Sequence, residues 1–471
     1  MKIKHVDLVI DETNPFATCQ LERKKYADVL TNLVETYADG FVLAINNEWG
    51  TGKSTFVKMW QQQLKNQGFK TLYFNAWEND FENKPLVALM SELSVLQEKG
   101  TEKIFKSLIS KGAVITKNVL PQLLKAIASK YIDTDMALDA IENTAKGATE
   151  ILKDEIKDYT SKKKGLKDFR DSLTEFVKET QSGKPIIFII DELDRCRPNY
   201  AVELLEQIKH FFSVPGIVFV LSIDKVQLGH AVRGVYGSDR INADEYLKRF
   251  IDVEYSIPRP NTELFCTYLY YYFEFNQFLY SVTRRGFPIF ANDGNTFIKT
   301  STLLFDKANL TLRTQEKIFA HSRIALLQLK ENSYVLPELF VMLAYIKMVN
   351  LEFYNKLKSK TLTIKNVIEE FNKICPKTTL EIERNEFIYI EAMLIFFYNN
   401  GLGNNERVRL SNHAGFEITK SNDPVISLID KSPNQDNFVS FLTSLENNSY
   451  IKNIKIQYLL NTLDLVDDIN I

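Results

Sequence analysis

The sequence has few of the features that mark a secreted or disulfide-rich protein. Only four cysteines occur among 471 residues, and none of them forms a CxxC pair. Such spacing excludes a disulfide framework and a zinc site of the usual ligand pattern, and it favours a reducing compartment. The amino terminus also lacks the apolar run of a secretory signal. We therefore expect a cytoplasmic protein.

Long hydrophobic runs and a large net charge of either sign are missing as well. The most apolar windows are shorter than about 18 residues or contain a charged side chain, so none predicts a membrane span. Lys and Arg number 58 and Asp and Glu number 60, which gives a formal net charge of −2. This balance does not indicate a nucleic-acid partner, although the lysines between positions 153 and 170 leave that alternative open.

The chain instead has the composition and the pattern of a globular α/β protein. Hydrophobic residues make up 45% and charged residues 25%. Short β-rich runs alternate with helical stretches, and they occupy residues 41–45, 71–77, 185–190, 217–223 and 250–257. Four runs are nearly continuously apolar, as in parallel strands covered on both faces, and the last alternates, as expected nearer an edge. The pattern predicts a parallel sheet flanked by helices.

The same pattern suggests how the chain is divided. Residues 85–183 show helical periodicity without a strand signal, so we expect a helical insertion between two parts of the core, 1–84 and 184–258. From residue 259 the chain is helical and rich in aromatic residues. We expect a helical region at 259–330, followed by an α-helical C-terminal domain at 331–471. An unknown protein partner is expected to bind this helical C-terminal region.

A glycine-rich segment follows the first predicted strand directly. Residues 46–55 read N-N-E-W-G-T-G-K-S-T, and Gly52, Lys53 and Ser54 fit the end of the phosphate-binding pattern G-x-x-x-x-G-K-[ST]. Asn47 stands where the first glycine of that pattern would be. Because Asn tolerates a positive φ better than other non-glycine residues, we expect the turn to be kept.

The residue types of this segment suit a nucleotide and its metal. Gly50 and Gly52 allow backbone N–H groups to converge on phosphate oxygens, and the amphipathic helix that follows directs its positive end at the same anion. We expect Lys53 to reach the β- and γ-phosphates and Ser54 to ligate Mg²⁺. The alternative is an incidental glycine-rich turn. The residues expected to contact the nucleotide here are Asn47, Trp49, Gly50, Thr51, Gly52, Lys53, Ser54 and Thr55.

An acidic pair ends the third predicted strand, in P-I-I-F-I-I-D-E-L-D-R-C-R-P at 185–198. We expect Asp191 to hold Mg²⁺ through water, and Glu192 to orient and deprotonate the attacking water. Two adjacent carboxylates at the end of a core strand are costly unless a cation lies nearby. The alternative is a surface turn that caps the next helix, and Asp194 is left as a second candidate for the base or an outer contact.

Other polar residues near these strand ends have two interpretations each. Arg195 and Arg197 either reach the same sheet edge or pair with Asp194 or Glu203. After the fourth predicted strand, Ser222 or Asp224 is placed to sense the γ-phosphate. Alternatively, Asp224 caps the helix that begins at residue 225.

With these motifs, the chain resembles the KAP family of P-loop NTPases over residues 10–330. The segments that carry the resemblance include E-W-G-T-G-K-S-T (48–55), F-N-A-W-E (74–78), D-E-L-D-R-C-R-P (191–198), F-V-L-S-I-D (219–224) and E-Y-L-K-R-F-I-D-V-E-Y-S-I-P (245–258). The resemblance implies an ATPase of the ASCE type, with an extra strand between the phosphate-loop strand and the acidic strand. It also implies ATP and Mg²⁺ as ligands and a helical region after the core.

The resemblance further implies roles for three arginines. Arg23 lies in an L-x-R segment that borders the adenine in this class. Arg249 matches a residue that reaches the γ-phosphate of a neighbouring copy in a homo-oligomer assembled through the NTPase core. Arg313 resembles an arginine that senses nucleotide in the same chain. The alternatives are that Arg249 pairs with an acid such as Glu245 and that Arg313 is an exposed helix charge.

Many KAP proteins carry transmembrane helices in the insertion. In this sequence the lysines of the insertion are too closely spaced for a span, so we expect a soluble member without membrane contact. The function implied is an ATP-hydrolysing switch or assembly in which Glu192, Lys53 and Arg249 act in catalysis. Relatives of this kind in prokaryotes often act in defence against phage or plasmids. The alternative is a non-hydrolysing, nucleotide-binding scaffold that recruits partner proteins.

Overall fold

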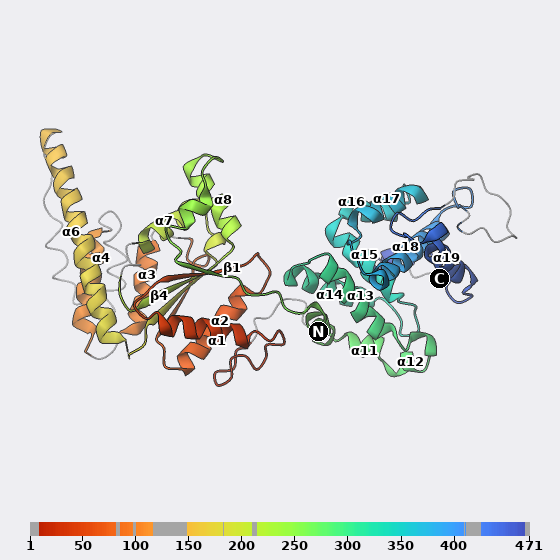
Figure 1. The fold of residues 1–471 in the computed structure, drawn as a ribbon, viewed down its shortest axis with the longest axis horizontal. Coiled ribbons are helices and arrows are strands. Elements are labelled where there is room, and N and C mark those ends of the chain that lie inside the picture. The colour runs from red at the N-terminus through yellow and green to blue at the C-terminus, as the bar shows by residue number, and fades with distance from the viewer. Residues whose placement is uncertain are drawn as a thin grey trace. The chain divides into compact units, whose positions relative to one another are not determined.

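A computed structural model describes residues 9–81, 85–97, 100–115, 148–181, 183–209, 214–408, 410 and 425–466. The chain divides into two compact units (Figure 1). We call them the core unit, Asp7–Arg259, and the helical unit, Pro260–Ile471. The finer boundaries expected at residues 84, 183 and 330 stay predictions.

The core unit is built on a parallel sheet. Among the described residues, five strands pair in the order β2-β3-β4-β1-β5, all parallel. They are β1 (Val42–Asn46), β2 (Thr71–Asn75), β3 (Ile186–Asp191), β4 (Ile217–Ile223) and β5 (Val253–Tyr255). They coincide with the five apolar runs, so the predicted α/β class is confirmed. β4 lies between β1 and β3, as the family resemblance implied.

The sequence indicated one of the two edge strands of the sheet and not the other. β5 lies at one edge, as its alternating sequence suggested. β2 forms the other edge, where a strand covered on both faces was expected. Leu72 and Phe74 are buried, whereas Thr71, Tyr73 and Asn75 are half-buried. The apolar run of this strand did not indicate its edge position, in which β2 has a strand neighbour on one side alone.

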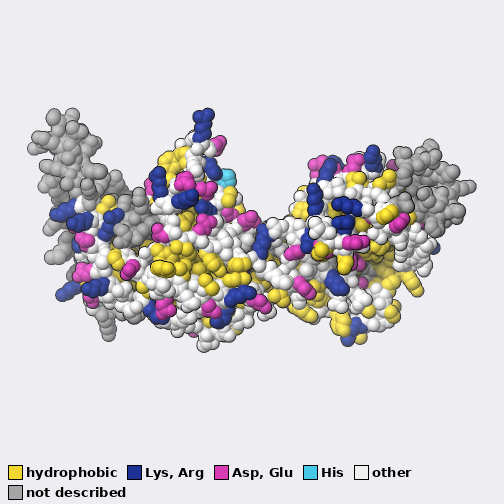
Figure 2. Space-filling model, viewed as in Figure 1, with side chains coloured by type: hydrophobic (Ala, Val, Ile, Leu, Met, Phe, Trp, Pro, Cys, Tyr) yellow, Lys and Arg dark blue, Asp and Glu magenta, His cyan; other side chains and the backbone are white. Residues whose placement is uncertain are grey.

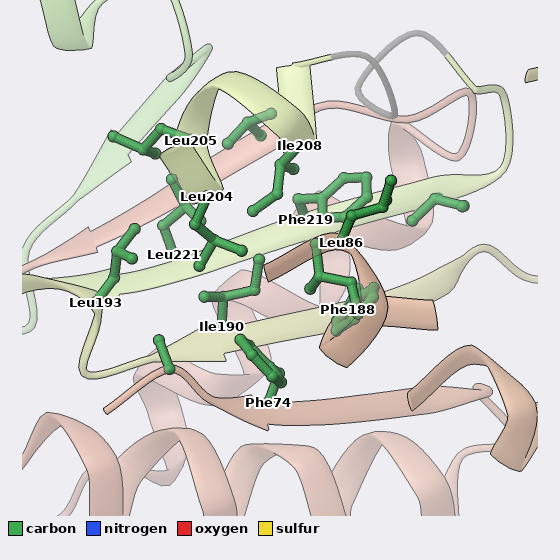
Figure 3. Close-up of a cluster of buried hydrophobic side chains, with 14 of the residues drawn as sticks. Phe74, Leu86, Phe188, Ile190, Leu193, Leu204, Leu205, Ile208, Phe219 and Leu221 are labelled. Carbon is green, nitrogen blue, oxygen red and sulfur yellow. The ribbon is translucent and has the colours of Figure 1, made fainter. Parts of the chain in front are cut away.

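Helices cover both faces of this sheet (Figure 1). Successive strand residues point to opposite faces. On one face, Phe188 and Ile190 pack with Leu204 of α7 in the cluster drawn in Figure 3. On the other face, Ile189 packs in a second cluster with Trp60 of α2. The helices of the core unit are α1 (Lys24–Thr36), α2 (Lys53–Asn66), α3 (Pro85–Leu93), η1 (Ser94–Leu96), α4 (Glu102–Ile115), α6 (Ala148–Thr180), η3 (Leu193–Arg195), α7 (Pro198–Lys209), α8 (Lys225–Tyr236) and α9 (Ala243–Leu247).

The described parts of the predicted insertion are helical. α4 packs on α6, and the ring centroids of Phe105 and Phe176 lie 5.4 Å apart at this contact. Residues 116–147, and the side chains of most lysines between 153 and 170, lie outside the described residues. On the face visible in Figure 2, basic and acidic side chains are interspersed. Within the described ranges, no helix is long and apolar enough to cross a membrane.

The helical unit follows Arg259. Nearly every residue of α15 is buried up to Ile346, and so are most residues of α18 after Phe387, so these two helices form much of its core. Its helices are α10 (Thr262–Tyr272), α11 (Phe275–Leu279), α12 (Val282–Arg285), η4 (Pro288–Phe290), α13 (Asp293–Lys307), α14 (Leu312–Leu326), α15 (Pro337–Val349), α16 (Leu351–Ser359), α17 (Ile364–Ile374), α18 (Glu381–Gly401), η5 (Pro433–Gln435), α19 (Asp436–Asn447) and α20 (Ile456–Asp464).

Candidate nucleotide-binding site

The loop between β1 and α2 presents unused hydrogen-bond donors. Gly50 and Gly52 have φ values of 79° and 80°, a conformation that side chains with a Cβ rarely adopt. Gly52 is the N-cap of α2 and supplies no side-chain cap. Within the described residues, the N–H groups of Gly50, Thr51 and Gly52 meet no acceptor. A 14-residue helix that begins in this way is suited to bind an anion.

Lys53 places a buried cation beside these donors. Its side chain is 8% exposed, and Nζ donates to the carbonyl oxygens of Asn47 and of Glu48, the latter at 3.1 Å. Burial lowers the pKa of the ammonium, and three nearby carboxylates oppose that effect. These carboxylates belong to Asp194, Asp224 and Asp191. A phosphate bound at the loop would therefore interact with a lysine ammonium that is poorly solvated by water.

Arg23 binds two carbonyl oxygens of the phosphate loop. The guanidinium donates to the carbonyl oxygens of Thr51 at 2.8 Å and of Gly52 at 3.2 Å. Arg23 is 5% exposed, and burial lowers its pKa. Because these bonds hold the carbonyl side of the two peptide groups, they favour a loop whose N–H groups remain available. The place of Arg23 at the loop is thereby clear, and the adenine contact stays a prediction.

Asn47 keeps the loop in place by a different means from the one expected. It does not adopt a positive φ, so the position does not need the conformational freedom of glycine. Its side chain binds both backbone polar groups of Ile257 instead, donating to O and accepting from N at 2.9 Å each.

The carboxyl ends of three neighbouring strands bring the acidic residues to this loop. Ser222 of β4 lies in register with Ile45 of β1 and with Asp191 of β3. Asp191 is 1% exposed, and its Oδ2 accepts from the Tyr73 hydroxyl at 2.8 Å. Burial and the Asp191 charge raise the pKa of Tyr73. The sequence did not single out Tyr73, because its place beside Asp191 depends on β2 pairing with β3.

Glu192 has an unusual backbone conformation and an ionic partner. Its φ is 60°, in the left-handed region that is costly for a residue with a Cβ. One carboxylate oxygen lies 2.6 Å from Nη1 of Arg195. Burial raises the pKa of Glu192, and Arg195 opposes this. The acids that pair with the two arginines are not the expected Asp194 and Glu203: Arg195 pairs with Glu192 at the end of β3, and Arg197 pairs with Asp80 at 2.7 Å.

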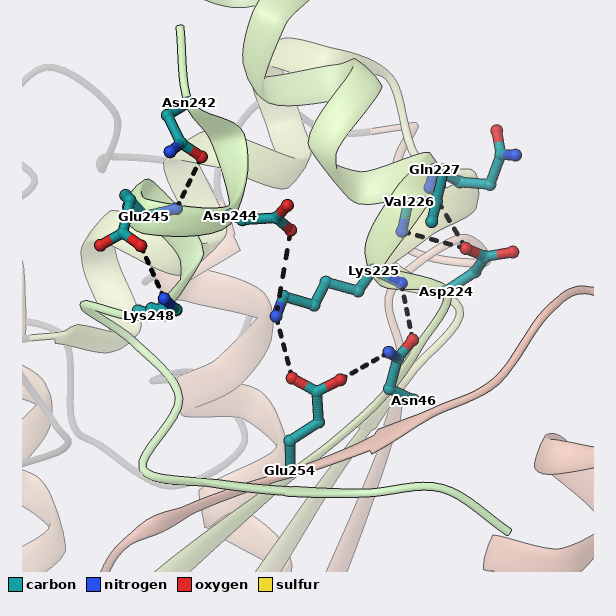
Figure 4. A network of polar contacts seen from close by, with 10 residues as sticks. All are labelled: Asn46, Asp224, Lys225, Val226, Gln227, Asn242, Asp244, Glu245, Lys248 and Glu254. Carbon is teal, nitrogen blue, oxygen red and sulfur yellow. Dashed lines mark hydrogen bonds and ion pairs between the residues drawn. The ribbon is translucent and has the colours of Figure 1, made fainter. Parts of the chain in front are cut away.

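Trp49 connects the loop to two further acids. Its indole Nε1 donates to Asp194, and its backbone N–H donates to Oδ2 of Asp224 at 3.3 Å. The other oxygen of Asp224 caps α8, as Figure 4 shows. Asp224 therefore caps a helix, as one interpretation expected, and it also contacts the phosphate loop, whereas its role as a sensor of the γ-phosphate stays a prediction. Trp49 also lines a cavity of about 490 Å³ together with Trp77 and Arg195.

The oxygen donors at this edge fit a magnesium ion. Ser54, in the first turn of α2, has a hydroxyl that makes no hydrogen bond with any described group. Asp191 supplies a buried carboxylate at the end of β3. A hydroxyl and a carboxylate are the ligand types that Mg²⁺ prefers, and its remaining positions are usually taken by water and phosphate.

The two remaining arginines both have exposed side chains. Arg249 is exposed after α9, and Glu245 pairs with Lys248 at 2.6 Å rather than with Arg249. The alternative pairing is therefore not observed. Arg313 lies exposed in the first turn of α14, in the helical unit. The roles of both residues stay predictions.

The strand order, the phosphate loop and the acidic strand end define a P-loop NTPase. A comparison with known families matches residues 23–328 to the KAP family P-loop domain. This match covers more than half of the chain, which therefore belongs to the KAP family of P-loop NTPases. A search of curated proteins gave no match. Among solved structures, the chain is similar to the Aeropyrum pernix ORC2 protein in its ADPNP-ADP complexes, with 15% identity, a TM-score of 0.32, and coverage of 74% of this chain and 72% of the other.

Proposed function

We propose that this protein binds ATP with Mg²⁺ and hydrolyses it, and that the bound nucleotide controls an assembly or a conformational switch. The observation that carries the proposal is the convergence at one sheet edge of an uncapped helix N-terminus, Lys53 and the pair Asp191 and Glu192. In a structural turn, the N–H groups and the carboxylates would be expected to satisfy one another.

Each side chain has a distinct part in the proposed reaction. Ser54 and Asp191 would hold the metal, which supplies charge stabilisation to the phosphates when bound. Glu192 would accept a proton from the attacking water as the bond to the γ-phosphorus forms. Lys53 would offset the negative charge that develops on the phosphate oxygens. The loop N–H groups would fix the triphosphate so that attack occurs in line with the leaving oxygen.

An assembled form would add a residue to this site. Arg249 is exposed and is not engaged by Glu245, so it is available to a neighbouring copy. Its charge would reach the γ-phosphate in trans and strengthen catalysis. Mass measurement with and without ATP is expected to show a nucleotide-dependent oligomer. In Arg249→Ala, turnover is expected to be lost while monomers still bind ATP. Equal turnover in this variant would argue against the role in trans.

A second candidate is a nucleotide-binding scaffold with little hydrolysis. One observation favours it: the carboxylate of Glu192 is engaged by Arg195 at 2.6 Å. A base held in this way would not accept a proton from water until the ion pair opened. Partners would then be recruited by the bound state alone, through the helical unit.

Steady-state phosphate release with ATP and Mg²⁺ separates the two candidates. For hydrolysis, we expect turnover in the wild type and a loss of about 100-fold or more in Glu192→Gln, with ATP binding retained. Glu203→Gln is a suitable control, since Glu203 is a partly exposed acid of α7 bonded to Gln207. ATP binding without Glu192-dependent turnover would favour the scaffold. No ATP binding at all would contradict both.

A further inference from the structure

Asn47 makes contacts that phosphate binding does not require. In the sheet, Ile45 of β1 is in register with Tyr255 of β5. Two residues beyond this pair, in the continuation of each strand, the Asn47 side chain donates to Ile257 O and accepts from Ile257 N. The amide thus continues the β1–β5 pairing beyond the end of both strands. A glycine at position 47 would remove this connection entirely.

Ile257 lies just before the end of the core unit. The segment that follows is Pro258, Arg259 and Pro260, and the boundary between the two units falls after Arg259. Two prolines restrict the backbone of this short segment, so a displacement of Ile257 is transmitted along it rather than absorbed. Glu48, next to Asn47 in the loop, also lies 3.9 Å from Arg259.

The same two loop residues are bound by Lys53. Its Nζ donates to the carbonyl oxygens of Asn47 and Glu48. Phosphate oxygens would compete with these carbonyls for the N–H donors of the ammonium. Occupation of the loop by a nucleotide would therefore change the hydrogen bonding of the two peptide groups that carry the contacts to Ile257 and Arg259.

The neighbouring strand ends are anchored separately (Figure 4). Asn46 donates to Glu254 at 2.7 Å and accepts from the N–H of Lys225 at 2.9 Å. Lys225 Nζ in turn lies 2.9 Å from Glu254. This network fixes β5 to β1 and to the start of α8. The segment after β5 is therefore the part that can respond to the loop while the strand stays in place.

We propose that Asn47 is a positioning residue that couples occupancy of the phosphate loop to residues 257–260, and through them to the helical unit. The coupling rests on the proposed function, because a nucleotide must first bind the loop. The amide of Asn47 carries most of it, since the pair of Glu48 and Arg259 is exposed and such pairs contribute little.

Hydrogen–deuterium exchange of the full-length chain tests this coupling. Exchange is followed in residues 49–55 and 256–262, with and without Mg²⁺ and a slowly hydrolysed ATP analogue that saturates each variant. In the wild type, we expect the analogue to slow exchange in both segments, by about fivefold or more at 256–262. In Asn47→Gly, exchange is expected to slow at 49–55 alone. Asn47→Ala should behave in the same way, and it separates loss of the amide from added glycine flexibility.

A matched control is Asn66→Ala at the end of α2. The side chain of Asn66 binds the carbonyl oxygen of Glu12 at 2.6 Å and is not bonded to any described residue of 256–262, so this variant should respond as the wild type does. Thermal unfolding establishes that each variant is folded. If the analogue fails to protect 49–55 in the wild type, the proposed function is wrong. If 49–55 is protected but 256–262 is unchanged, or if both Asn47 variants keep the wild-type response, the coupling alone is overturned.

Discussion

The core unit and the helical unit both bury charged side chains, but the surroundings of these charges differ. In the core unit, Lys53, Asp191 and Asp224 come from the first turn of α2 and from two strand ends, and they lie close together beside unused backbone N–H groups. In the helical unit, Arg284 donates to the carbonyl oxygens of Glu331 and Ser333, at 2.9 and 2.8 Å. Burial of a charge thus does not by itself identify a site. What distinguishes the core unit is the loop beside the charges, where the backbone N–H groups of Gly50, Thr51 and Gly52 have no acceptor among the described residues.

This difference predicts opposite consequences for removing one buried cation from each unit. Arg284 is fully buried, pairs with Asp293, and lies over the ring of Phe290 at 4.3 Å. Arg284→Ala leaves Asp293 and two carbonyl groups without their donor. We expect a loss of about 3–5 kcal/mol in the free energy of unfolding of the helical unit. Urea denaturation measures it, and the exposed neighbour Arg285→Ala is the control, with a change within about 0.5 kcal/mol. Equal stability of both variants would contradict the assignment of Arg284 to the fold.

Removing Lys53 should affect the ligand instead of the fold. Its ammonium is desolvated and bound to loop carbonyls, so its loss leaves no buried acid without a partner of its own. We expect Lys53→Ala to weaken ATP binding by about 3 kcal/mol, or about 100-fold. Calorimetric titration measures this change, and thermal unfolding should move little. Lys65→Ala, at the exposed end of the same helix, should bind as the wild type does. A large loss of stability in Lys53→Ala without weaker binding would remove the contrast between the units.

Glu391 is a second buried ionisable side chain of the helical unit to compare with those of the core unit. It is fully buried in α18, Ser427 donates to its Oε2, and Oε1 has no partner among the described residues. Burial raises its pKa to about 8, with Asp430 adding to the shift. The folded protein therefore binds a proton between pH 4.5 and 8 that the unfolded chain has released.

The sign of the resulting pH dependence follows from this difference in bound protons. The contribution of Glu391 to stability is fully present below about pH 4.5 and is lost as the pH rises toward about 8. Glu391→Gln keeps an acceptor for Ser427 but cannot ionise. We expect the variant and the wild type to be similarly stable at pH 5, and the variant to be more stable by about 4 kcal/mol at pH 9. Denaturation at the two pH values checks this. A constant difference between the variants would show that Glu391 does not titrate in this range.

The sequence predicted the parts of the core unit that depend on local order. The five apolar runs became the five strands, and the glycines, Lys53 and the pair at the end of β3 were recognised from residues adjacent in the chain. The contacts that the sequence did not predict join distant segments. Tyr73 and Asp191 are 118 residues apart, and Asn47 and Ile257 are 210 apart. Such pairs depend on which strands are neighbours in the sheet, and the pattern of one chain does not give that order in enough detail.

The expected length of β5 illustrates the same limit of local pattern. The apolar alternation predicted a strand over residues 250–257, and the structure has Val253–Tyr255. Before this strand, the Asp252 N–H still donates to Val42 O at 3.0 Å, and the Asp252 carboxylate accepts from the Val42 N–H at 2.8 Å. After it, Ile257 is held by the Asn47 side chain. Side-chain hydrogen bonds thus hold the residues on either side of β5, although the sequence alternation continues beyond both ends of the strand.

One tyrosine–aspartate pair in each unit allows the two units to be compared at the level of a single hydrogen bond. The Tyr73 hydroxyl donates to Asp191 at 2.8 Å in the core unit, and the Tyr354 hydroxyl donates to Asp464 at 3.0 Å in the helical unit. Tyr354 also donates to Leu460 O in α20, and Lys347 binds the same Asp464 at 2.9 Å, so that this pair fastens the end of α20. The bond of Tyr73 instead orients a carboxylate proposed to hold the metal.

Replacing Tyr73 by phenylalanine should therefore change the Mg²⁺ dependence of turnover, whereas replacing Tyr354 should change the stability of the fold. Tyr73→Phe removes the group that orients Asp191, and we expect the Mg²⁺ concentration for half-maximal turnover to rise by about tenfold. Tyr354→Phe should leave this concentration unchanged and lower the free energy of unfolding by about 1 kcal/mol, since Asp464 keeps its lysine partner. A Mg²⁺ titration of turnover and a urea denaturation curve on both variants measure the two effects. If both substitutions lowered stability alone, the Tyr73–Asp191 pair would be a structural contact of the same kind as its counterpart, and Asp191 would lose its support as a metal ligand.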